Sequence, residues 1–577
     1  MRPLFFMCQP FRVAIKGRID KINTPNPATM SKHFLSGQMM DYPLTIDRLI
    51  EHANNVYGSR KIHTKLADGS FHQYTYADMY KRVKRLGNVL HRLGIKTGDR
   101  VATLSWNNYQ HFELYFGIPG CGAVCHTLNL RLAADQLTYI VNHADDQLIF
   151  VDASLIPLAE SFAAQCPGVK HYIILNGSAA VTTKLPNVLH YEELLHHASE
   201  EFTWQCTDES MAMGLCYTSG TTGNPKGVLY SHRSMFLHTY GINMANVLGF
   251  LSSDVVLPVV PQFHAQAWGL PYACAMTGAE VVMPGMHLAP ALLAETIEKM
   301  GVTVAAGVPT IWQGLYHDLK AKPRDLSKLR SLIVGGSAMP RSLIQAFEKD
   351  LHVHVKHAWG MTELSPLGTV SNLQAQHEFM TPDQQWDVKA TQGYPVAGVE
   401  IRIVDEEGLH LPWDGTSVGE LQVRGPWVVK RYYKQDPATV AESFTKDEWF
   451  RTGDVASVSP DGYMKITDRT KDLIKSGGEW ISSVELENAL VAHPQVKEAA
   501  VIAIPDEKWG ERPLAVVIPA SADQPVDRSE LINHLAQRFV KIWLPEKVVF
   551  VKEIPKTSVG KIDKKVIRQR YKDGLLA

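Results

Sequence analysis

The stretch YTSGTTGNPKGV, residues 217–228, holds three glycines, four Ser or Thr hydroxyls and one lysine within a dozen positions. Glycines let backbone N–H groups turn toward an anion, hydroxyls add donors, and Lys226 supplies positive charge. The composition therefore predicts a phosphate-holding loop. It is not a Walker A motif, because Lys226 follows Pro225 and precedes Gly227. A plain surface loop between a strand and a helix is the alternative for TSGTTG alone, and the continuation KGVLYSHRS disfavours it.

Alternating strands and helices surround this loop. Apolar residues at helical spacing predict helices within 42–58 and 72–95, the second entered at Thr75. Residues 111–128 predict a helix, a glycine break and a strand. Short apolar runs predict further strands at 99–107, 147–153, 171–177 and 280–285. Such alternation over hundreds of residues predicts an α/β fold with layered, largely parallel sheets.

The predicted secondary structure changes after about residue 390, from alternating strands and helices to short strands with turn residues between them. Three short alternating runs, 399–408, 419–425 and 462–470, predict a β-rich subdomain. Beyond Asp468, helices and strands predicted over about 105 residues suit a small α+β domain. We therefore expect a large N-terminal domain over 41–467, a hinge over 468–472, and a small mobile C-terminal domain over 473–577.

Composition disfavours several function classes. The 58 Lys and Arg residues balance 59 Asp and Glu residues, so a nucleic-acid partner is not expected. No apolar run approaches the ~20 residues that span a bilayer. Seven scattered cysteines without a CxxC pair indicate a reducing compartment, here the cytoplasm, and neither a disulfide framework nor a zinc site.

Residues 1–40 have no functional interpretation. The first 29 are basic and slightly amphipathic, as in an organellar targeting peptide. Asp20, the scarcity of serine and a second methionine at Met30 disfavour that interpretation. We expect instead an extension without fixed structure, ahead of a translation start at Met30.

Several motifs together resemble those of the adenylate-forming superfamily, which includes acyl-CoA synthetases, peptide-synthetase adenylation domains and beetle luciferases. The resemblance covers about 41–570 and is greatest to bacterial medium- and long-chain fatty acyl-CoA synthetases. Besides the loop, it is carried by VVPQFHAQAWGLPY (259–272), HAWGMTELSP (357–366) and KDLIKSGGEWISSVELENAL (471–490). It implies that a carboxylate attacks the α-phosphate of ATP to give acyl-AMP and pyrophosphate. The thiol of CoA then takes the acyl group and releases AMP.

The resemblance also assigns a nucleotide site. Trp359 is implied to stack on the adenine, while Asp454 in FRTGD, where the family commonly has YRTGD, and Arg469 in DRTKD contact the ribose. Glu363 and Thr218 are the candidate Mg²⁺ ligands, because a carboxylate and phosphate oxygens suit this ion. The other implied nucleotide contacts are Ser219, Gly220, Thr221, Thr222, Lys226, Gly336, Ser337, Ala338, Ala358, Gly360, Met361 and Thr362. In isolation Glu363 could be a helix-start carboxylate, Asp454 a turn residue and Arg469 a solvated charge.

Two lysines are implied to serve the two half-reactions. Lys561, in PKTSVGKIDKK (555–565), resembles the catalytic lysine of adenylation, which bridges the substrate carboxylate and the α-phosphate. A rotation of the small domain about Lys471 would withdraw it and bring KSGGEW toward the acyl-adenylate. That motif contributes Lys475, Gly477, Gly478 and Trp480. The plainer alternatives are a solvated lysine-rich end and an ordinary Gly-Gly turn.

The stretch PQFHAQAWG, residues 261–269, bears on the acid that is activated. Amino-acid adenylation domains carry an aspartate where this chain has His264, and a pocket without a carboxylate disfavours an ammonium group. Trp268 resembles a gate for the acyl chain, one turn beyond His264 if the segment is helical; a core tryptophan is the alternative. The predicted pocket walls are Gly307, Val308, Pro309 and Trp312, and Trp312 could limit the depth. His264 joins Thr362, Glu363, Lys475 and Lys561 as a catalytic candidate.

We therefore expect a medium- or long-chain fatty acyl-CoA synthetase that uses ATP, Mg²⁺ and CoA. A CoA ligase for a short thioether acid, such as 3-methylmercaptopropionate, stays open. A luciferase-like oxygenase is disfavoured by the intact KSGGEW motif, and a nucleotide-binding pseudoenzyme by the presence of Lys561 and Glu363. The resemblance also suggests a homodimer formed through the large domain.

Overall fold

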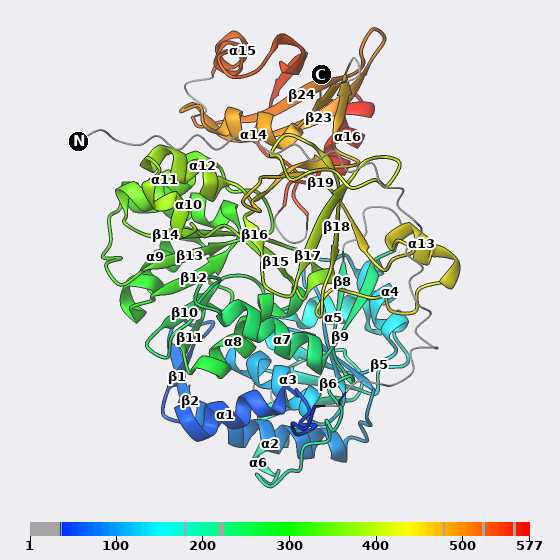
Figure 1. Ribbon diagram of the computed structural model, residues 1–577. Coiled ribbons are helices and arrows are strands. Elements are labelled where there is room, and N and C mark those ends of the chain that lie inside the picture. The colour runs from blue at the N-terminus through cyan, green and yellow to red at the C-terminus, as the bar shows by residue number, and fades with distance from the viewer. Residues whose placement is uncertain are drawn as a thin grey trace, which may run out of the picture. The chain divides into compact units, whose positions relative to one another are not determined.

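The computed structural model describes residues 35, 37–177, 181–218, 224–476, 479–521, 526–557 and 561–576. The chain divides into two units, residues 1–42 and 43–577. In the first unit only residues 35 and 37–42 are described, and they form neither helix nor strand. The expectation for residues 1–40 therefore lies largely outside the described residues. The architecture that follows belongs to the second unit (Figure 1).

A seven-stranded sheet carries the start of the predicted phosphate loop. Its order is β7-β6-β5-β3-β4-β8-β9, and its pairs are parallel except β8 with β9. Its strands are β3 (Arg100–Leu104), β4 (Val124–Thr127), β5 (Asp146–Asp152), β6 (His171–Leu175), β7 (Val188–His190), β8 (Ala212–Thr218) and β9 (Lys226–Ser231). The loop thus joins two antiparallel strands, although residues 219–223 lie outside the described part.

A nine-stranded sheet carries most of the other motifs. Its order is β16-β15-β14-β13-β12-β10-β11-β1-β2, parallel from β14 to β1 and antiparallel at both edges. Its strands are β1 (Lys61–Lys65), β2 (Phe71–Thr75), β10 (Val255–Pro258), β11 (Glu280–Met283), β12 (Val304–Gly307), β13 (Ser331–Val334), β14 (His354–Gly360), β15 (Leu367–Val370) and β16 (Tyr394–Pro395).

Helices fill the space between the two sheets and cover their outer faces. The central helices share one apolar core with both sheets: α1 (Asp47–Tyr57), α2 (Tyr76–Arg92), α3 (Tyr109–Gly120), α7 (His232–Asn243) and α8 (Leu270–Thr277). Two helices cover the seven-stranded sheet: α4 (Ala134–Ala144) and α5 (Ile156–Ala163). Three cover the nine-stranded sheet on its other side: α9 (Pro290–Met300), α10 (Pro309–Ala321) and α11 (Arg341–Asp350). The predicted layered α/β class is confirmed (Figure 1).

Local sequence signals set the ends of several helices. The Thr75 hydroxyl accepts the Asp78 backbone N–H at 3.2 Å, and the Asp78 carboxylate accepts the Thr75 N–H at 3.0 Å. This reciprocal capping box satisfies backbone donors that have no partner within the first turn. The prediction that α2 is entered at Thr75 is therefore confirmed.

The C-terminal third consists of smaller pieces. A four-stranded antiparallel sheet contains β17 (Glu400–Val404), β18 (Gly419–Arg424), β19 (Phe450–Val458) and β20 (Met464–Arg469), as expected for a β-rich subdomain. A separate sheet with its own apolar core follows: β21 (Ile474–Ser476), β22 (Glu479–Ile481), β23 (Val496–Asp506), β24 (Gly510–Pro519) and β25 (Lys547–Phe550). Its helices are α14 (Ser483–Val491), α15 (Arg528–Ala536) and α16 (Lys564–Lys572). The domain boundaries given from sequence stay predictions.

The remaining short helices include α6 (Tyr191–His196), α12 (Pro382–Ala390) and α13 (Val440–Ser443). Within the described ranges, no helix is both long enough and apolar enough to cross a membrane. The six described cysteines are buried free thiols.

Candidate active site

Most of the predicted site residues gather where neighbouring parallel strands end. His264 and Trp268 follow β10, Pro309 follows β12, residues 336–338 follow β13, and residues 358–360 end β14. Ligands of open α/β sheets bind outside the carboxyl ends of the strands. A cavity of about 880 Å³ lies here, and the β-rich subdomain and the segment around Lys561 complete its wall.

The cavity brings together eighteen of the residues named from sequence. They are Thr218, Lys226, His264, Trp268, Pro309, Gly336, Ser337, Ala338, Ala358, Trp359, Gly360, Met361, Thr362, Glu363, Asp454, Arg469, Lys471 and Lys561. Six others lie outside the described residues: Ser219, Gly220, Thr221, Thr222, Gly477 and Gly478. The other five are not among the residues that line it: Gly307, Val308, Trp312, Lys475 and Trp480.

Trp359 and Asp454 form a direct contact at the predicted nucleotide site. The Trp359 indole N–H donates to Asp454 Oδ2 at 3.0 Å, and Arg469 Nε lies 3.3 Å from Asp454 Oδ1. Asp454 on β19 and Arg469 on β20 are register partners, so the antiparallel pairing itself brings them together. A Cβ on Gly368 would lie 2.5 Å from the Trp359 ring, which fixes the ring against β15. An aromatic face beside a carboxylate suits a nucleoside.

Glu363 is a buried carboxylate with a tyrosine partner. It lies in the short helix η3 (Thr362–Leu364), and its Oε1 accepts the Tyr432 hydroxyl at 2.7 Å. Burial raises the pKa of Glu363, while the Tyr432 hydrogen bond opposes that rise. In the part of the chain that the structure describes, no cluster of three His, Cys, Asp or Glu side chains could hold a metal. One carboxylate and the Thr218 hydroxyl, completed by phosphate oxygens, fit Mg²⁺.

Lys561 projects its charge into the cavity. Burial, with a further contribution from the positive charge of Arg469, lowers the pKa of Lys561 to about 8, although Asp454 and Glu363 oppose the shift. Lys561 lies beside Gly336, whose φ of +87° favours glycine; a Cβ there would lie 3.5 Å from Lys561 Cε, an ordinary contact, and a tight 3.2 Å from Val308. The site therefore holds a positive charge that bound anions would stabilise.

The segment that carries His264 and Trp268 is not a right-handed helical turn. Residues 265–268 have φ values of 44° to 58°, and Gly269 has φ +75°, so the chain forms a left-handed turn. The Tyr272 hydroxyl holds this turn through a 2.8 Å hydrogen bond to Gln266 Oε1. Burial and the nearby Lys561 charge lower the pKa of His264 to about 3, so its imidazole is neutral.

Trp312 lies behind the cavity wall. It is fully buried, packs with α9 and α11 residues, and donates its indole N–H to the Gly307 carbonyl at 3.2 Å. A Cβ on Gly307 would lie 2.9 Å from the Trp312 ring. The ring therefore fills the outer core, and Gly307 makes room for it rather than for a ligand.

Lys475 and Trp480 lie away from the cavity that contains Lys561. The Lys475 ammonium lies 4.6 Å from the Trp480 ring centroid, and 43% of Trp480 is exposed. The Lys475 backbone N–H donates to Glu511 at 2.8 Å. The structure therefore places only one of the two predicted lysines at the site, the one implied for adenylation.

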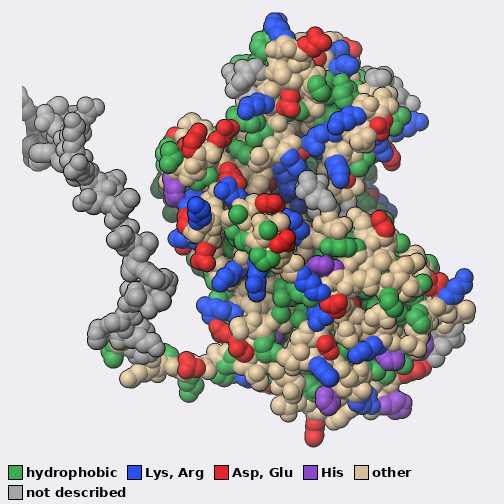
Figure 2. Space-filling view, turned by 90° about the vertical axis from the view of Figure 1, so that its right-hand side faces the viewer, with side chains coloured by type: hydrophobic (Ala, Val, Ile, Leu, Met, Phe, Trp, Pro, Cys, Tyr) green, Lys and Arg blue, Asp and Glu red, His purple; other side chains and the backbone are tan. Residues whose placement is uncertain are grey.

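Basic side chains surround the cavity more densely than the motifs indicated. Those that line it and were not predicted are Arg131, Arg451, Lys556, Lys564, Lys565 and Arg568. Figure 2 shows Lys and Arg side chains gathered in a recess on one face. Tyr432 and the buried His357 also line the cavity. Tyr432, in RYYKQ, carries no sequence pattern that indicates phosphate chemistry, whereas His357 precedes the AWGMTE motif directly.

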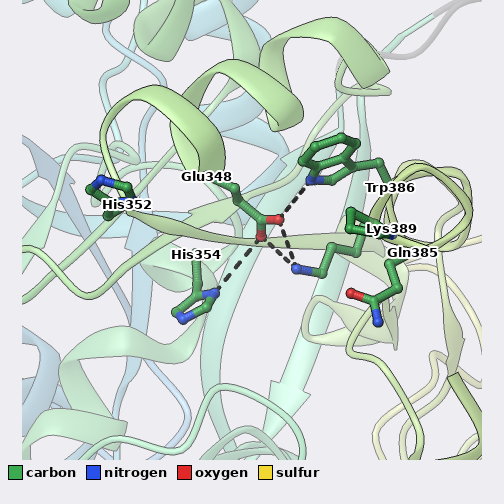
Figure 3. Close-up of a pocket in the computed structure, with 7 residues that line it drawn as sticks. Glu348, His352, His354, Gln385, Trp386 and Lys389 are labelled. Atoms are coloured by element: carbon green, nitrogen blue, oxygen red, sulfur yellow. Dashed lines mark hydrogen bonds and ion pairs between the residues drawn. The ribbon is translucent and has the colours of Figure 1, made fainter. Parts of the chain in front are cut away.

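A second, smaller pocket of about 420 Å³ lies between α11, α12 and the start of β14 (Figure 3). Its central carboxylate, Glu348, already accepts Lys389 Nζ at 2.7 Å and Trp386 Nε1 at 3.1 Å. His354 Nδ1 lies 3.9 Å away, and His352 stands apart from the carboxylate in this view. The charged groups satisfy one another, and the pocket contains none of the predicted site residues.

The match to known proteins extends over nearly the whole second unit. Residues 50–433 match the family model "AMP-binding enzyme", and residues 485–561 match "AMP-binding enzyme C-terminal domain". The chain therefore belongs to the AMP-binding enzyme family, as its motifs indicated. A solved anthranilate CoA ligase in complex with anthranoyl-AMP is 25% identical, with a TM-score of 0.82, over 93% of this chain and 99% of that one.

Curated relatives are named for different acids. The 3-methylmercaptopropionyl-CoA ligase of Ruegeria lacuscaerulensis is 45% identical over 93% of this chain and 99% of its own. The medium-chain-fatty-acid–CoA ligase of Ectopseudomonas oleovorans is 43% identical over 94% and 98%. The long-chain-fatty-acid–CoA ligase of Thermus thermophilus is 45% identical over 93% and 97%.

Proposed function

We propose that this chain is an ATP-dependent acyl-CoA ligase that activates a medium- or long-chain fatty acid. The enzyme is an AMP-forming ligase, and the proposal concerns its substrate and the roles of its residues. In the first step the acid attacks the α-phosphate of ATP, forms acyl-AMP and releases pyrophosphate. In the second step the thiol of CoA attacks the acyl carbon, the thioester forms and AMP leaves.

The observation that carries the proposal is the apolar part of the cavity. Several of its lining residues belong to, or pack on, the core between the two sheets, among them Ile242, Leu248, Trp268, Ile333 and Leu367. The acidic lining residues come from η3, the β-rich subdomain and the chain after β20: Glu363, Asp454, Asp468, Asp472, Glu487, Glu498 and Asp563. An acyl chain beside these apolar side chains would be buried against hydrocarbon, and no acidic residue is among them, which suits a hydrocarbon and disfavours an ammonium.

The polar part of the cavity suits adenylation. Trp359 would cover the adenine, and Asp454 would accept the ribose hydroxyls. Lys561 would lie between the attacking carboxylate and the α-phosphate, where it offsets the negative charge that builds up. Glu363 and Thr218 would hold Mg²⁺, which would add positive charge at the phosphates. The neutral His264 would donate or accept a hydrogen bond without repelling Lys561.

Thioester formation then needs a second arrangement. Lys561 occupies the cavity in the structure, and Lys475 lies outside it. We expect the segment after Lys471 to rotate and to present KSGGEW to the acyl-adenylate. A Mg²⁺ requirement, a homodimer and a cytoplasmic location likewise remain predictions from the family resemblance.

A short thioether acid is the second candidate. Two relatives that are 45% identical to this chain are named 3-methylmercaptopropionyl-CoA ligases. A methylthio group is apolar, so the same pocket could accept it. Each buried CH₂ contributes about 0.8 kcal/mol, so a pocket of fatty-acid depth favours the longer acid strongly.

The deciding experiment is AMP release with carboxylates from C3 to C18, including 3-methylmercaptopropionate, with and without CoA. A maximum among medium or long chains, with turnover that requires CoA, supports the proposal. A maximum at the thioether acid transfers the function to the second candidate. If no acid releases AMP, the proposed activity is wrong.

A further inference from the structure

One segment of the chain is hydrogen-bonded to both elements that carry predicted phosphate contacts, η3 and β9. The segment 427–433 lies between β18 and the short helix η5 (Pro437–Thr439). The Val429 N–H donates to the Glu363 carbonyl at 2.7 Å, and the Tyr433 N–H donates to the Gly227 carbonyl at 2.8 Å. The segment is therefore bonded both to η3 and to β9, the strand that follows the phosphate loop.

The side chain of Tyr432 also contacts one residue of each of these two elements. It is 7% exposed, and its hydroxyl donates to Glu363 Oε1 at 2.7 Å. The Lys226 ammonium lies 4.8 Å from its ring centroid, within the range of a cation–π contact. Within the described residues, this hydroxyl is the sole side-chain donor to the Glu363 carboxylate. One tyrosine thus contacts both the predicted metal carboxylate and the predicted loop lysine.

We propose that Tyr432 is a positioning residue for the adenylation step, which holds Glu363 and Lys226 in place for the metal–nucleotide complex. The inference rests on the proposed function, because Glu363 is assigned to Mg²⁺ there. The hydrogen bond on Oε1 restrains the carboxylate and leaves Oε2 available to a ligand in the cavity that Glu363 lines. The ring face holds the ammonium beside the same site. Preorganised groups need not be ordered when the ligand binds.

The test separates the hydroxyl from the ring. Tyr432→Phe removes the bond to Glu363 and keeps the face beneath Lys226. The measured quantity is the affinity for Mn²⁺ in the presence of α,β-methylene-ATP, detected by electron paramagnetic resonance. This analogue is used because it cannot release pyrophosphate at the scissile bond. A hydrogen bond to a charged group is worth about 1.5–3 kcal/mol, so we expect Mn²⁺ affinity to fall by about 10-fold or more. The half-saturating Mg²⁺ concentration for acyl-AMP formation should rise by the same factor, with kcat at saturating Mg²⁺ nearly unchanged.

Tyr433→Phe is the matched control. Tyr433 is the adjacent tyrosine in the same segment, but its ring contacts His143 at 5.7 Å between centroids rather than Glu363. It should bind Mn²⁺ as the parent enzyme does. Equal losses in both variants, or an unchanged affinity in Tyr432→Phe, overturn the inference, because they assign the residue a purely structural role or none.

A double-mutant comparison gives a second, independent measurement. In a Glu363→Gln background, Tyr432→Phe should weaken metal binding no further, since the partner carboxylate is already gone. An additional loss of the full size would contradict the inference. Failure of the proposed function is distinguishable: in that case the parent enzyme releases no AMP with any acid, whatever the metal binding of the Tyr432 variant.

Discussion

Replacing Lys561 by methionine tests the charge balance of the site directly. Burial, together with the positive charge of Arg469, lowers the pKa of this lysine from 10.5 to about 8. That difference corresponds to about 3 kcal/mol against the charged form in the ligand-free cavity. A carboxylate and an α-phosphate bound beside it, as proposed, would reverse the sign, so the charge would stabilise most strongly the state in which both anions meet. Methionine keeps the apolar stem beside Gly336 and removes only the ammonium.

The expected loss is about 10²–10³ in the rate of acyl-AMP formation, or about 3–4 kcal/mol of transition-state stabilisation. Pyrophosphate–ATP exchange measures this half-reaction. The second half, measured from synthetic acyl-AMP and CoA, should keep its rate, because the proposed rotation withdraws Lys561 before the thiol enters. Lys572→Met, at the exposed end of α16, is the control for a general loss of charge. Equal losses in the two half-reactions, or a loss below about 10-fold in the first, would refute the reasoning.

Three further predictions follow from the same contacts. The kcat/KM for adenylation should fall as pH rises through about 8, because a lysine with a lowered pKa is charged below that value and neutral above it. Lys561→Arg should move this fall to higher pH. A flat profile of the parent enzyme from pH 7 to 10 would contradict the prediction. Trp359→Phe keeps the aromatic face but loses the 3.0 Å hydrogen bond to Asp454. In steady-state assays the KM for ATP should rise about 10-fold, with the KM for CoA unchanged. A raised KM for CoA with an unchanged KM for ATP would contradict the prediction. Thr75→Ala removes the capping box of α2 and should lower the free energy of unfolding by about 1 kcal/mol in a urea titration. The specific activity of this variant should stay at the parent level. A large loss of specific activity would show that α2 supports the site.

The sequence predicted local structure well where one element determines it. Thr75 and Asp78 are three residues apart and complete one helix turn, so their capping box needs nothing from the rest of the chain. The residues after β10, β12, β13 and β14 follow short buried strands, and parallel pairing brings their ends to one edge. The cavity therefore collects most of the predicted residues because the sheet order makes their strands neighbours.

The contacts that were missed depend on segments far apart in the chain. Tyr432 reaches Glu363 only because backbone bonds at Val429 and Tyr433 dock its segment on η3 and β9. The left-handed turn at 265–268 was equally hidden, since Ala265, Gln266 and Trp268 are not residues that favour positive φ. Trp312 illustrates the converse: its proximity to Gly307 was visible in the sequence, but which side of the sheet its ring would pack on was not.

The charge balance of the site gives a physical reason for the Lys561 ammonium to leave the cavity between the two half-reactions rather than to stay in place. Before pyrophosphate leaves, the site must hold the acid carboxylate and the triphosphate together, and a buried lysine lowers that repulsion. Afterwards the carboxylate charge is gone, the acyl-AMP phosphate carries one negative charge, and pyrophosphate has taken the remaining charge with it, so less negative charge remains beside Lys561. A lysine whose charged form burial and the Arg469 charge together disfavour by about 3 kcal/mol is then held less firmly. Lys561 lies between β25 and α16, and Lys475 lies on β21, so both follow the expected hinge. If the chain beyond Lys471 rotates as proposed, the departure of pyrophosphate charge would itself favour the exchange of one lysine for the other.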